Sequence, residues 1–262
     1  MSKQTFEIKR NRKTKQVPDE IKLDIDMNSI PKEDIYGYYI INRMENSGLF
    51  GLPMIGDFHE EYPEYIALFN HPAEFLKNDK TCVGFYIDDF HFDDIDGIYQ
   101  AIIYKDVDLL RYYKYRLKDV KYFIAPDYSS FGNFRFSTLI HQLEKEIIVT
   151  GWLVLELKAI VYPNLTYGLR NTFDDCFKII YKYSNVALSL KGCSTGENSL
   201  LLKEAIKKFV DTNEPRAIIV YSVASDETTY ALLQYAIDKG VKIYVIDNSL
   251  RTGNLRRLSN NG

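Results

Sequence analysis

The stretch AIIVYSVASDETTYALLQYAIDKGVKIYVI, residues 217–246, decides the fold class of this chain. It begins with Ala217–Tyr221 and ends with Lys242–Ile246, two runs rich in the branched and aromatic side chains that favour strands. Between them, residues 228–237 repeat apolar side chains at helical spacing, and Gly240 follows where a helix end favours a left-handed residue. A strand, a helix and a second strand in this order predict a βαβ unit with parallel strands.

The same alternation of strand-like and helix-like segments extends upstream of this unit. Residues 200–210 repeat apolar side chains at helical spacing, and the polar residues 211–215, which end in a proline, close that segment. Four apolar runs are typical of buried strands: residues 83–87, 122–125, 159–162 and 186–190. We therefore predict an α/β protein with a parallel sheet.

Two earlier segments bear on whether that sheet closes on itself. Residues 52–55 and 65–69 are short apolar runs consistent with strands, whereas residues 34–47 fit a helix and a strand equally well. Six clear strands and two early ones would make eight, the number in a closed barrel, but no helical segment separates the early pair. We expect an irregular or incomplete (βα) barrel-like parallel sheet, with an open doubly wound sheet as the alternative.

Length and composition bear on the domain organisation and exclude some classes of protein. The 262 residues suit one large domain, and 46% hydrophobic with 26% charged residues is ordinary for a globular protein. We predict a flexible basic arm at residues 1–20, a single α/β domain at 21–250 and a basic polar tail at 251–262. The net charge of -3 argues against a surface built throughout for nucleic acid. Either basic terminus is nevertheless a candidate contact for nucleic acid or a host protein.

Three cysteines and the lack of a long apolar run indicate the compartment. Cys82, Cys176 and Cys193 are odd in number and form no C-x-x-C pair, which is typical of neither a disulfide framework nor a zinc site. No apolar run approaches the roughly 18 residues that a membrane span needs, and no apolar segment of a signal peptide follows the N-terminus. These features predict a cytoplasmic protein without a membrane partner.

Polar side chains follow several of the predicted strands at the point where each strand ends. Because the carboxyl ends of parallel strands lie on one side of an α/β sheet or barrel, we expect these side chains to line one site. The alternative is that Asp and Asn at such positions simply cap the helices that follow. The predicted ligand-binding residues are Asp88, Asp89, Asp127, Ser129, Asn164 and Lys191.

The acidic members of this set also raise the hypothesis of a bound metal. Asp88 and Asp89 follow one strand-like run and Asp127 follows the next, and hard carboxylate ligands suit Mg²⁺ or Mn²⁺. Alternation along an extended chain would allow only Asp88 or Asp89 to face the site. The acids within residues 93–96 are placed to begin the following helix, which is the simpler interpretation of that part of the cluster.

Residues 191–196, Lys-Gly-Cys-Ser-Thr-Gly, connect a predicted strand to a predicted helix. Backbone amides at the start of a helix, together with Lys191, form a candidate anion site, although the order of residues is not that of a Walker loop. The alternative interpretation is an ordinary flexible loop.

A short nuclease-like pattern is also present, in which Asp127 is followed at a suitable interval by Glu156 and Lys158. Asp127 follows the end of its strand, whereas Glu156 and Lys158 precede theirs, so a parallel sheet would place them at opposite edges. The predicted fold therefore argues against a nuclease site of this kind. No complete catalytic constellation is evident in the sequence, and whether the protein is an enzyme stays open.

Five motifs, in this order, carry a resemblance to a known family. They are FYIDDFHF at 85–92, FIAPDYS at 123–129, VYPNLTY at 161–167, VALSLKG at 186–192 and IVYS at 219–222. Over roughly residues 50–225, the chain resembles family 4417 of the domains of unknown function, found in bacteria, their phages and mobile elements. The family usually has Trp where this chain has Tyr167, and Thr-Val-Gly where it has Leu190-Lys191-Gly192. The resemblance implies a phage or mobile-element origin and carries no activity.

Two hypotheses about function follow. The leading one is a polar ligand site at the strand carboxyl ends, which binds a phosphate-bearing small molecule or nucleic acid. The competing one is a non-enzymatic interaction protein, such as a replication accessory or a host-protein inhibitor, built on an enzyme-like scaffold. Converging polar strand ends favour the first hypothesis, and the basic termini favour the second.

Overall fold

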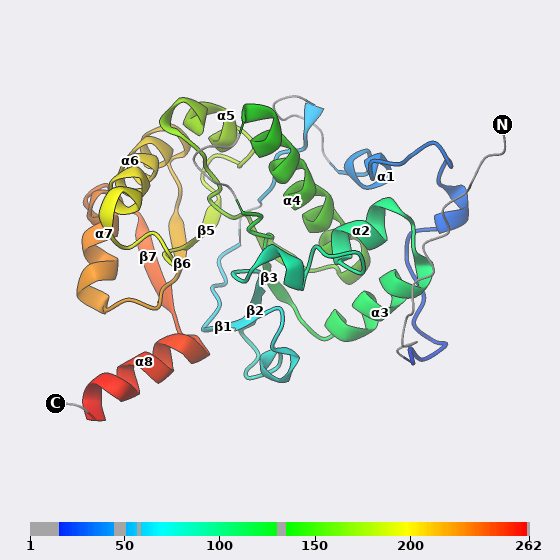
Figure 1. Ribbon diagram of the computed structural model, residues 1–262, viewed down its shortest axis with the longest axis horizontal. Coiled ribbons are helices and arrows are strands. Elements are labelled where there is room, and N and C mark those ends of the chain that lie inside the picture. Colours follow the sequence, from blue (N-terminus) through cyan, green and yellow to red (C-terminus); the bar gives the residue numbers. More distant parts are fainter. Residues whose placement is uncertain (1–15, 45–50, 57–58, 130–134, 261–262) are drawn as a thin grey trace, which may run out of the picture.

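A computed structural model of the protein describes residues 16–44, 51–56, 59–129 and 135–260. Within these residues, seven short strands form two parallel sheets, each with sequential strand order (Figure 1). The four-stranded sheet contains β1 (Tyr65–Leu68), β2 (Thr81–Gly84), β3 (Tyr122–Ile124) and β4 (Ile160–Tyr162). The three-stranded sheet contains β5 (Asn185–Ser189), β6 (Ala217–Tyr221) and β7 (Lys242–Ile246). The prediction of an α/β fold with parallel strands is confirmed.

Helices connect most consecutive strands and lie along the outer sides of the two sheets (Figure 1). Those beside the four-stranded sheet are α2 (Ile98–Ile103), α3 (Val107–Leu117) and the long α4 (Phe136–Leu157). Those beside the three-stranded sheet are α6 (Gly196–Asn213) and α7 (Asp226–Asp238). The remaining helices are α1 (Tyr38–Ile41), α5 (Phe173–Phe177) and the terminal α8 (Ser249–Asn260). None of the helices in the described ranges is both long and apolar enough to cross a membrane.

The two sheets meet at both of their edges through isolated parallel bridges. Asn164, just after β4, bridges Ala187 of β5, and the backbone of Ala187 makes two hydrogen bonds of 2.8 Å there. On the other side, Tyr65 bridges Asp247, and the amide of Ile66 donates to the carbonyl of Asp247 at 2.8 Å. The strands therefore surround a common interior, but in the described part of the chain no continuous ladder closes them into a barrel. The irregular, incomplete barrel is the predicted architecture, and the sequential strand order is unlike that of a doubly wound sheet.

This interior has a hydrophobic core of its own, separate from the core under the helices. Alternate residues of a strand point to opposite faces, so each strand supplies side chains to both cores. Every strand contributes at least one buried residue to the interior core, for example Ile66, Cys82, Ile124, Tyr162, Ala187, Ile219 and Ile246. Burial on both faces explains why the strand segments of the sequence are apolar throughout rather than alternating.

The two early apolar runs have different outcomes, since residues 65–69 contain the strand β1, as predicted, whereas residues 52–55 do not form a strand. Residues 52–55 are not a strand, because only Ile55 pairs, through an isolated bridge to Ile180. The predicted total of eight strands is therefore not reached, because this segment is not one of them. In residues 34–47 the structure shows a short helix, α1, and residues 45–47 lie outside the described ranges. At the other end of the chain, the predicted polar tail is helical from Ser249 to Asn260.

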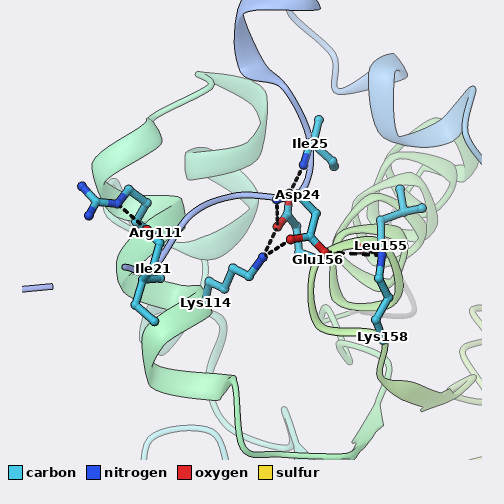
Figure 2. A network of polar contacts seen from close by, with 8 residues as sticks. All are labelled: Ile21, Asp24, Ile25, Arg111, Lys114, Leu155, Glu156 and Lys158. Carbon is cyan, nitrogen blue, oxygen red and sulfur yellow. Dashed lines mark hydrogen bonds and ion pairs between the residues drawn. The ribbon is translucent and has the colours of Figure 1, made fainter. Parts of the chain in front are cut away.

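The segment before α1 is fastened to α3 and α4 by a buried carboxylate (Figure 2). Glu156, close to the end of α4, accepts hydrogen bonds from the backbone amides of Asp24 and Ile25, both at 2.8 Å. Lys114 of α3 lies 3.0 Å from the Glu156 carboxylate and 2.6 Å from that of Asp24. These contacts attach the chain to α3 and α4 at Asp24 and Ile25. Residues 1–15 of the predicted arm lie outside the described residues.

Candidate functional site

A cavity of about 480 Å³ opens at the carboxyl ends of the strands and is lined by both sheets. The four-stranded sheet contributes the segments that follow β2, β3 and β4. The three-stranded sheet contributes the end of β5 and the loop that leads to α6. Five of the six predicted ligand-binding residues line this cavity: Asp88, Asp127, Ser129, Asn164 and Lys191.

The sixth predicted residue, Asp89, supports the cavity wall instead of lining it. Its carboxylate accepts hydrogen bonds from the backbone amide and the hydroxyl of Ser129, at 3.2 and 2.9 Å. The strand expected over residues 83–87 ends at Gly84, since the chain leaves the sheet and then forms a 3-10 turn at Asp89–His91. Of the two adjacent carboxylates, Asp88 therefore lines the cavity and Asp89 holds the loop after β3.

Asp127 has a strongly perturbed acid–base equilibrium. Burial raises the pKa of Asp127 from 3.8 to about 6, the negative charge of Asp89 adds to the rise, and a hydrogen bond from Asn164 opposes it. The side-chain nitrogen of Asn164 lies 3.0 Å from Asp127 Oδ1. A carboxyl that titrates close to neutral pH inside a cavity is typical of functional sites, where burial and neighbouring charges are arranged together.

Asn164 is the centre of a hydrogen-bond network beneath the cavity. Its side-chain nitrogen donates to Asp127 and to the hydroxyl of Thr166, at 3.0 and 3.1 Å. Its side-chain oxygen accepts the hydroxyl of Tyr86 at 3.0 Å. Thr166 in turn donates to the carboxyl of Glu146 at 3.1 Å. Since both N–H groups and the oxygen of the Asn164 amide are engaged, the amide has one preferred orientation, which fixes Asp127 beside it.

Glu146 is a residue of this network that the sequence reasoning missed. It lies within α4 and is 1% exposed, and burial raises its pKa well above 4.5, with a further contribution from the negative charge of Asp127. A signal was present in the sequence, because Leu143 and Val149 lie three positions away on either side and place Glu146 on the apolar face of its helix. Glutamate is almost never fully buried without a partner, so its position on that face marks a special site.

The basic side of the cavity comes from the loop between β5 and α6. Among the described residues that line the cavity, Lys191 is the only Lys or Arg, and its side chain is exposed. The ammonium group lies 3.4 Å from the backbone carbonyl of Tyr86, which follows β2 of the other sheet. Gly192 and Gly196 have left-handed backbone conformations, with φ of +78° and +61°, which favour glycine and shape the loop.

The nuclease-like pattern does not assemble. Glu156 binds the segment around Asp24, and Lys158 follows the last turn of α4, while Asp127 lines the cavity at the other end of the strands. Glu146 and Glu156 are ten residues apart on the same helix, which corresponds to about 15 Å along its axis. Asp127 and the pair Glu156 and Lys158 therefore lie at opposite ends of the strands, as expected for a parallel sheet. They cannot act on one ligand.

Two of the three predicted metal ligands are hydrogen-bonded to protein groups in the described ranges. Those ranges contain no group of three or more His, Cys, Asp or Glu side chains that could hold a metal ion. Asp89 binds Ser129, and Asp127 accepts a hydrogen bond from Asn164. A Mg²⁺ or Mn²⁺ ion bound by Asp88, Asp89 and Asp127 stays a prediction.

Three larger hollows occur among the described residues. Two, of about 820 and 800 Å³, lie at the amino ends of the strands, and one, of about 630 Å³, lies between the segment around Asp24 and α3. None of the three is lined by any of the predicted ligand-binding residues or by Glu146. In barrel-like α/β proteins the carboxyl ends of the strands carry the functional sites, and the perturbed carboxyl of Asp127 lies at those ends. The smaller cavity is therefore the candidate site.

Comparisons with known proteins add an affiliation. A family model described as Domain of unknown function (DUF4417) matches residues 44–237, which is most of the chain. The match confirms the resemblance carried by the five sequence motifs. No curated protein and no solved structure matches the chain.

Proposed function

The chain belongs to DUF4417, a family of unknown function, and we propose that its cavity at the strand carboxyl ends binds a small, phosphate-bearing polar molecule. The observation that carries the proposal is that one cavity is lined both by Asp127, with its hydrogen-bond network, and by Lys191, with its glycine-containing loop. A ligand with an anionic group at one end and a hydrogen-bond donor at the other matches both.

The loop before α6 supports the anionic end of this ligand. Lys191, Gly192 and Cys193 line the cavity, as does Asn198 in the first turn of α6. α6 is 18 residues long, so its N-terminal amides and the positive end of its dipole favour a negative charge at this place. Lys191 adds a full positive charge, which turns a weak anion preference into a recognisable site for phosphate.

Asp127 supports the donor end. Above pH 6 it is mainly a carboxylate, which accepts hydrogen bonds, and among the described residues only Asn164 donates to it, at Oδ1. Sugar hydroxyl groups are donors of the matching kind. A volume of about 480 Å³ lies within the usual range for small-molecule sites. Sugar phosphates and nucleoside monophosphates therefore fit both the chemistry and the size.

Ribose 5-phosphate is expected to bind more tightly than either inorganic phosphate or ribose, since it has both groups. Lys191→Ala is expected to weaken binding of the two phosphate-containing probes by about 10- to 100-fold, the range for a lost charge-assisted hydrogen bond, and to leave ribose unaffected. Asp127→Asn is expected to weaken the two ribose-containing probes and to leave inorganic phosphate unaffected. Calorimetric titration of each protein with each probe at neutral pH measures all these values.

Lys203→Ala is the matched control for Lys191→Ala. Lys203 is an exposed lysine of α6 that does not line the cavity, so its loss changes the net charge equally. An equal loss of phosphate affinity in both variants would reduce the effect to general electrostatics. If no probe, and no nucleotide with or without Mg²⁺, raises the melting temperature at millimolar concentration, the proposed function is wrong.

The basic termini support a macromolecular partner less well than the cavity supports a small one. Arg251 of the predicted basic tail is buried, and its guanidinium binds the Asp226 carboxylate and the carbonyl of Ala224. The Arg251 guanidinium is therefore paired within the protein and is not available to bind a phosphate backbone. The nucleic-acid or host-protein partner, the phage or mobile-element origin and the cytoplasmic location rest on the sequence.

A further inference from the structure

Glu146 combines deep burial with incomplete pairing. It is 1% exposed, and its Oε1 atom has no hydrogen bond of good geometry among the described residues, although the backbone of Asn164 is close enough to oppose the rise in the pKa of the Glu146 carboxyl. The neighbouring Lys145 does not neutralise it, because Lys145 is ion-paired with Asp93. A buried carboxyl without a cation is destabilising in itself, so its presence in α4 calls for a role in the network it joins.

Three hydrogen bonds in series connect Glu146 to the cavity. Glu146 Oε2 accepts the hydroxyl of Thr166 at 3.1 Å, the Thr166 oxygen accepts from Asn164 Nδ2 at 3.1 Å, and the same nitrogen donates to Asp127 Oδ1 at 3.0 Å. The directions follow from the number of protons. Thr166 gives its only hydroxyl proton to Glu146, so it must accept from Asn164, and the second N–H of Asn164 is left for Asp127.

We propose that Glu146 is a positioning residue for the ligand site, which acts through Thr166 and Asn164 to set the direction in which Asp127 meets the ligand. As far as the ligand is concerned, this inference rests on the proposed function. With an apolar side chain at position 146, the Thr166 hydroxyl would lose its acceptor and turn to another one. Asn164 would then lose a fixed neighbour, and Asp127 would lose the constraint on its own orientation.

Glu146→Leu and Glu146→Gln separate this role from simple packing. Glutamine keeps an oxygen that accepts from Thr166, so Glu146→Gln is expected to bind ribose 5-phosphate within about twofold of the unmodified protein. Glu146→Leu is expected to bind it about tenfold more weakly, the lower end of what outer hydrogen-bond partners contribute to the groups they orient. Affinity for inorganic phosphate, which contacts the Lys191 end, is expected to stay the same in both variants.

Thr166→Val tests the connection between Glu146 and Asn164. It is expected to weaken ribose 5-phosphate as much as Glu146→Leu does, and the double variant is expected to be no weaker than either single one, because both changes break the same chain. Glu144→Leu is the matched control, since Glu144 lies on the same helix, is only partly buried and pairs with His141 instead. Additive losses, or an equal loss for inorganic phosphate, would overturn the positioning role.

A measurement without ligand keeps the inference separate from the proposed function. The side-chain amide signals of Asn164 in ¹⁵N NMR, assigned by their absence in Asn164→Asp, are expected to show two protected protons in the unmodified protein and in Glu146→Gln. In Glu146→Leu and Thr166→Val their exchange with water is expected to be faster. Unchanged signals in Glu146→Leu would overturn the inference. If the signals change but no probe binds the unmodified protein, the positioning of Asp127 stands and the proposed ligand is wrong.

Discussion

Glu156→Ala is expected to lower the free energy of unfolding by about 3–5 kcal/mol, the usual loss when one partner of a buried ion pair is removed. The Glu156 side chain is 1% exposed, and it pairs with Lys114, which is itself largely buried. The substitution also leaves the backbone amides of Asp24 and Ile25 without their acceptor. Each buried donor that loses its partner adds its own desolvation cost.

Urea denaturation of the two proteins measures this loss. Glu64→Ala is the matched control, because it makes the same chemical change in an exposed ion pair with Lys80 and is expected to have a far smaller effect. Limited proteolysis adds a local measure, since cleavage within residues 16–25 is expected to be much faster in Glu156→Ala. Equal unfolding free energies for the two variants would show that the buried cluster does not stabilise the fold.

Asp127→Asn is expected to stabilise the folded protein at neutral pH while it weakens the ribose-containing ligands. The pKa of Asp127 rises from 3.8 to about 6 on folding, chiefly because of burial. The folded state therefore holds the proton more tightly than the unfolded state, and stability falls as the pH rises from 3.8 to 6. An asparagine has no proton to lose, so it avoids this decrease, which amounts to at most about 3 kcal/mol.

The pH dependence provides the decisive comparison for Asp127→Asn. Below pH 3.8 the aspartic acid is protonated in both states, so the difference in stability between variant and unmodified protein is expected to be small. It should grow between pH 3.8 and 6 and stay constant above that range. Asp119→Asn, the same change at an exposed residue, is expected to stay within about 0.5 kcal/mol throughout. A destabilised Asp127→Asn at neutral pH would mean that Asp127 holds the fold together and is not a strained functional group.

Most of the strands were predictable from the sequence because they are buried on two sides, and β7, which is only partly buried, keeps the same apolar composition. Ala217–Tyr221 and Lys242–Ile246 were predicted with the bounds that β6 and β7 have. Composition does not reveal how many partners a segment finds, so residues 52–55 have a strand-like sequence although only Ile55 pairs. The sequence also does not reveal that β2 ends at Gly84, before the predicted end at residue 87. That end depends on a local turn in which the amide of Ile87 donates to the carbonyl of Phe85 at 2.7 Å.

The site was predictable only as far as strand direction determines it. Parallel strands place their carboxyl ends together, and this alone brings Asp127, Asn164 and Lys191 to one cavity. Strand direction does not determine which of two adjacent carboxylates faces inward, which was decided by the bond between Asp89 and Ser129. Glu146 could not be assigned to the site from spacing, because its contact with Thr166 depends on how α4 packs against the loop after β4.

The junctions between the two sheets have a mechanical consequence. Within the three-stranded sheet, neighbouring strands pair along five residues, whereas each junction between the sheets consists of an isolated bridge. The angle between the two sheets is therefore held by fewer backbone hydrogen bonds than the pairing within the three-stranded sheet. Asp127 follows a strand of the four-stranded sheet and Lys191 follows a strand of the three-stranded sheet. A molecule bound to both residues would therefore connect the two sheets. Binding strength would then include the work of setting that angle, and substitutions at either junction would change affinity without touching the ligand.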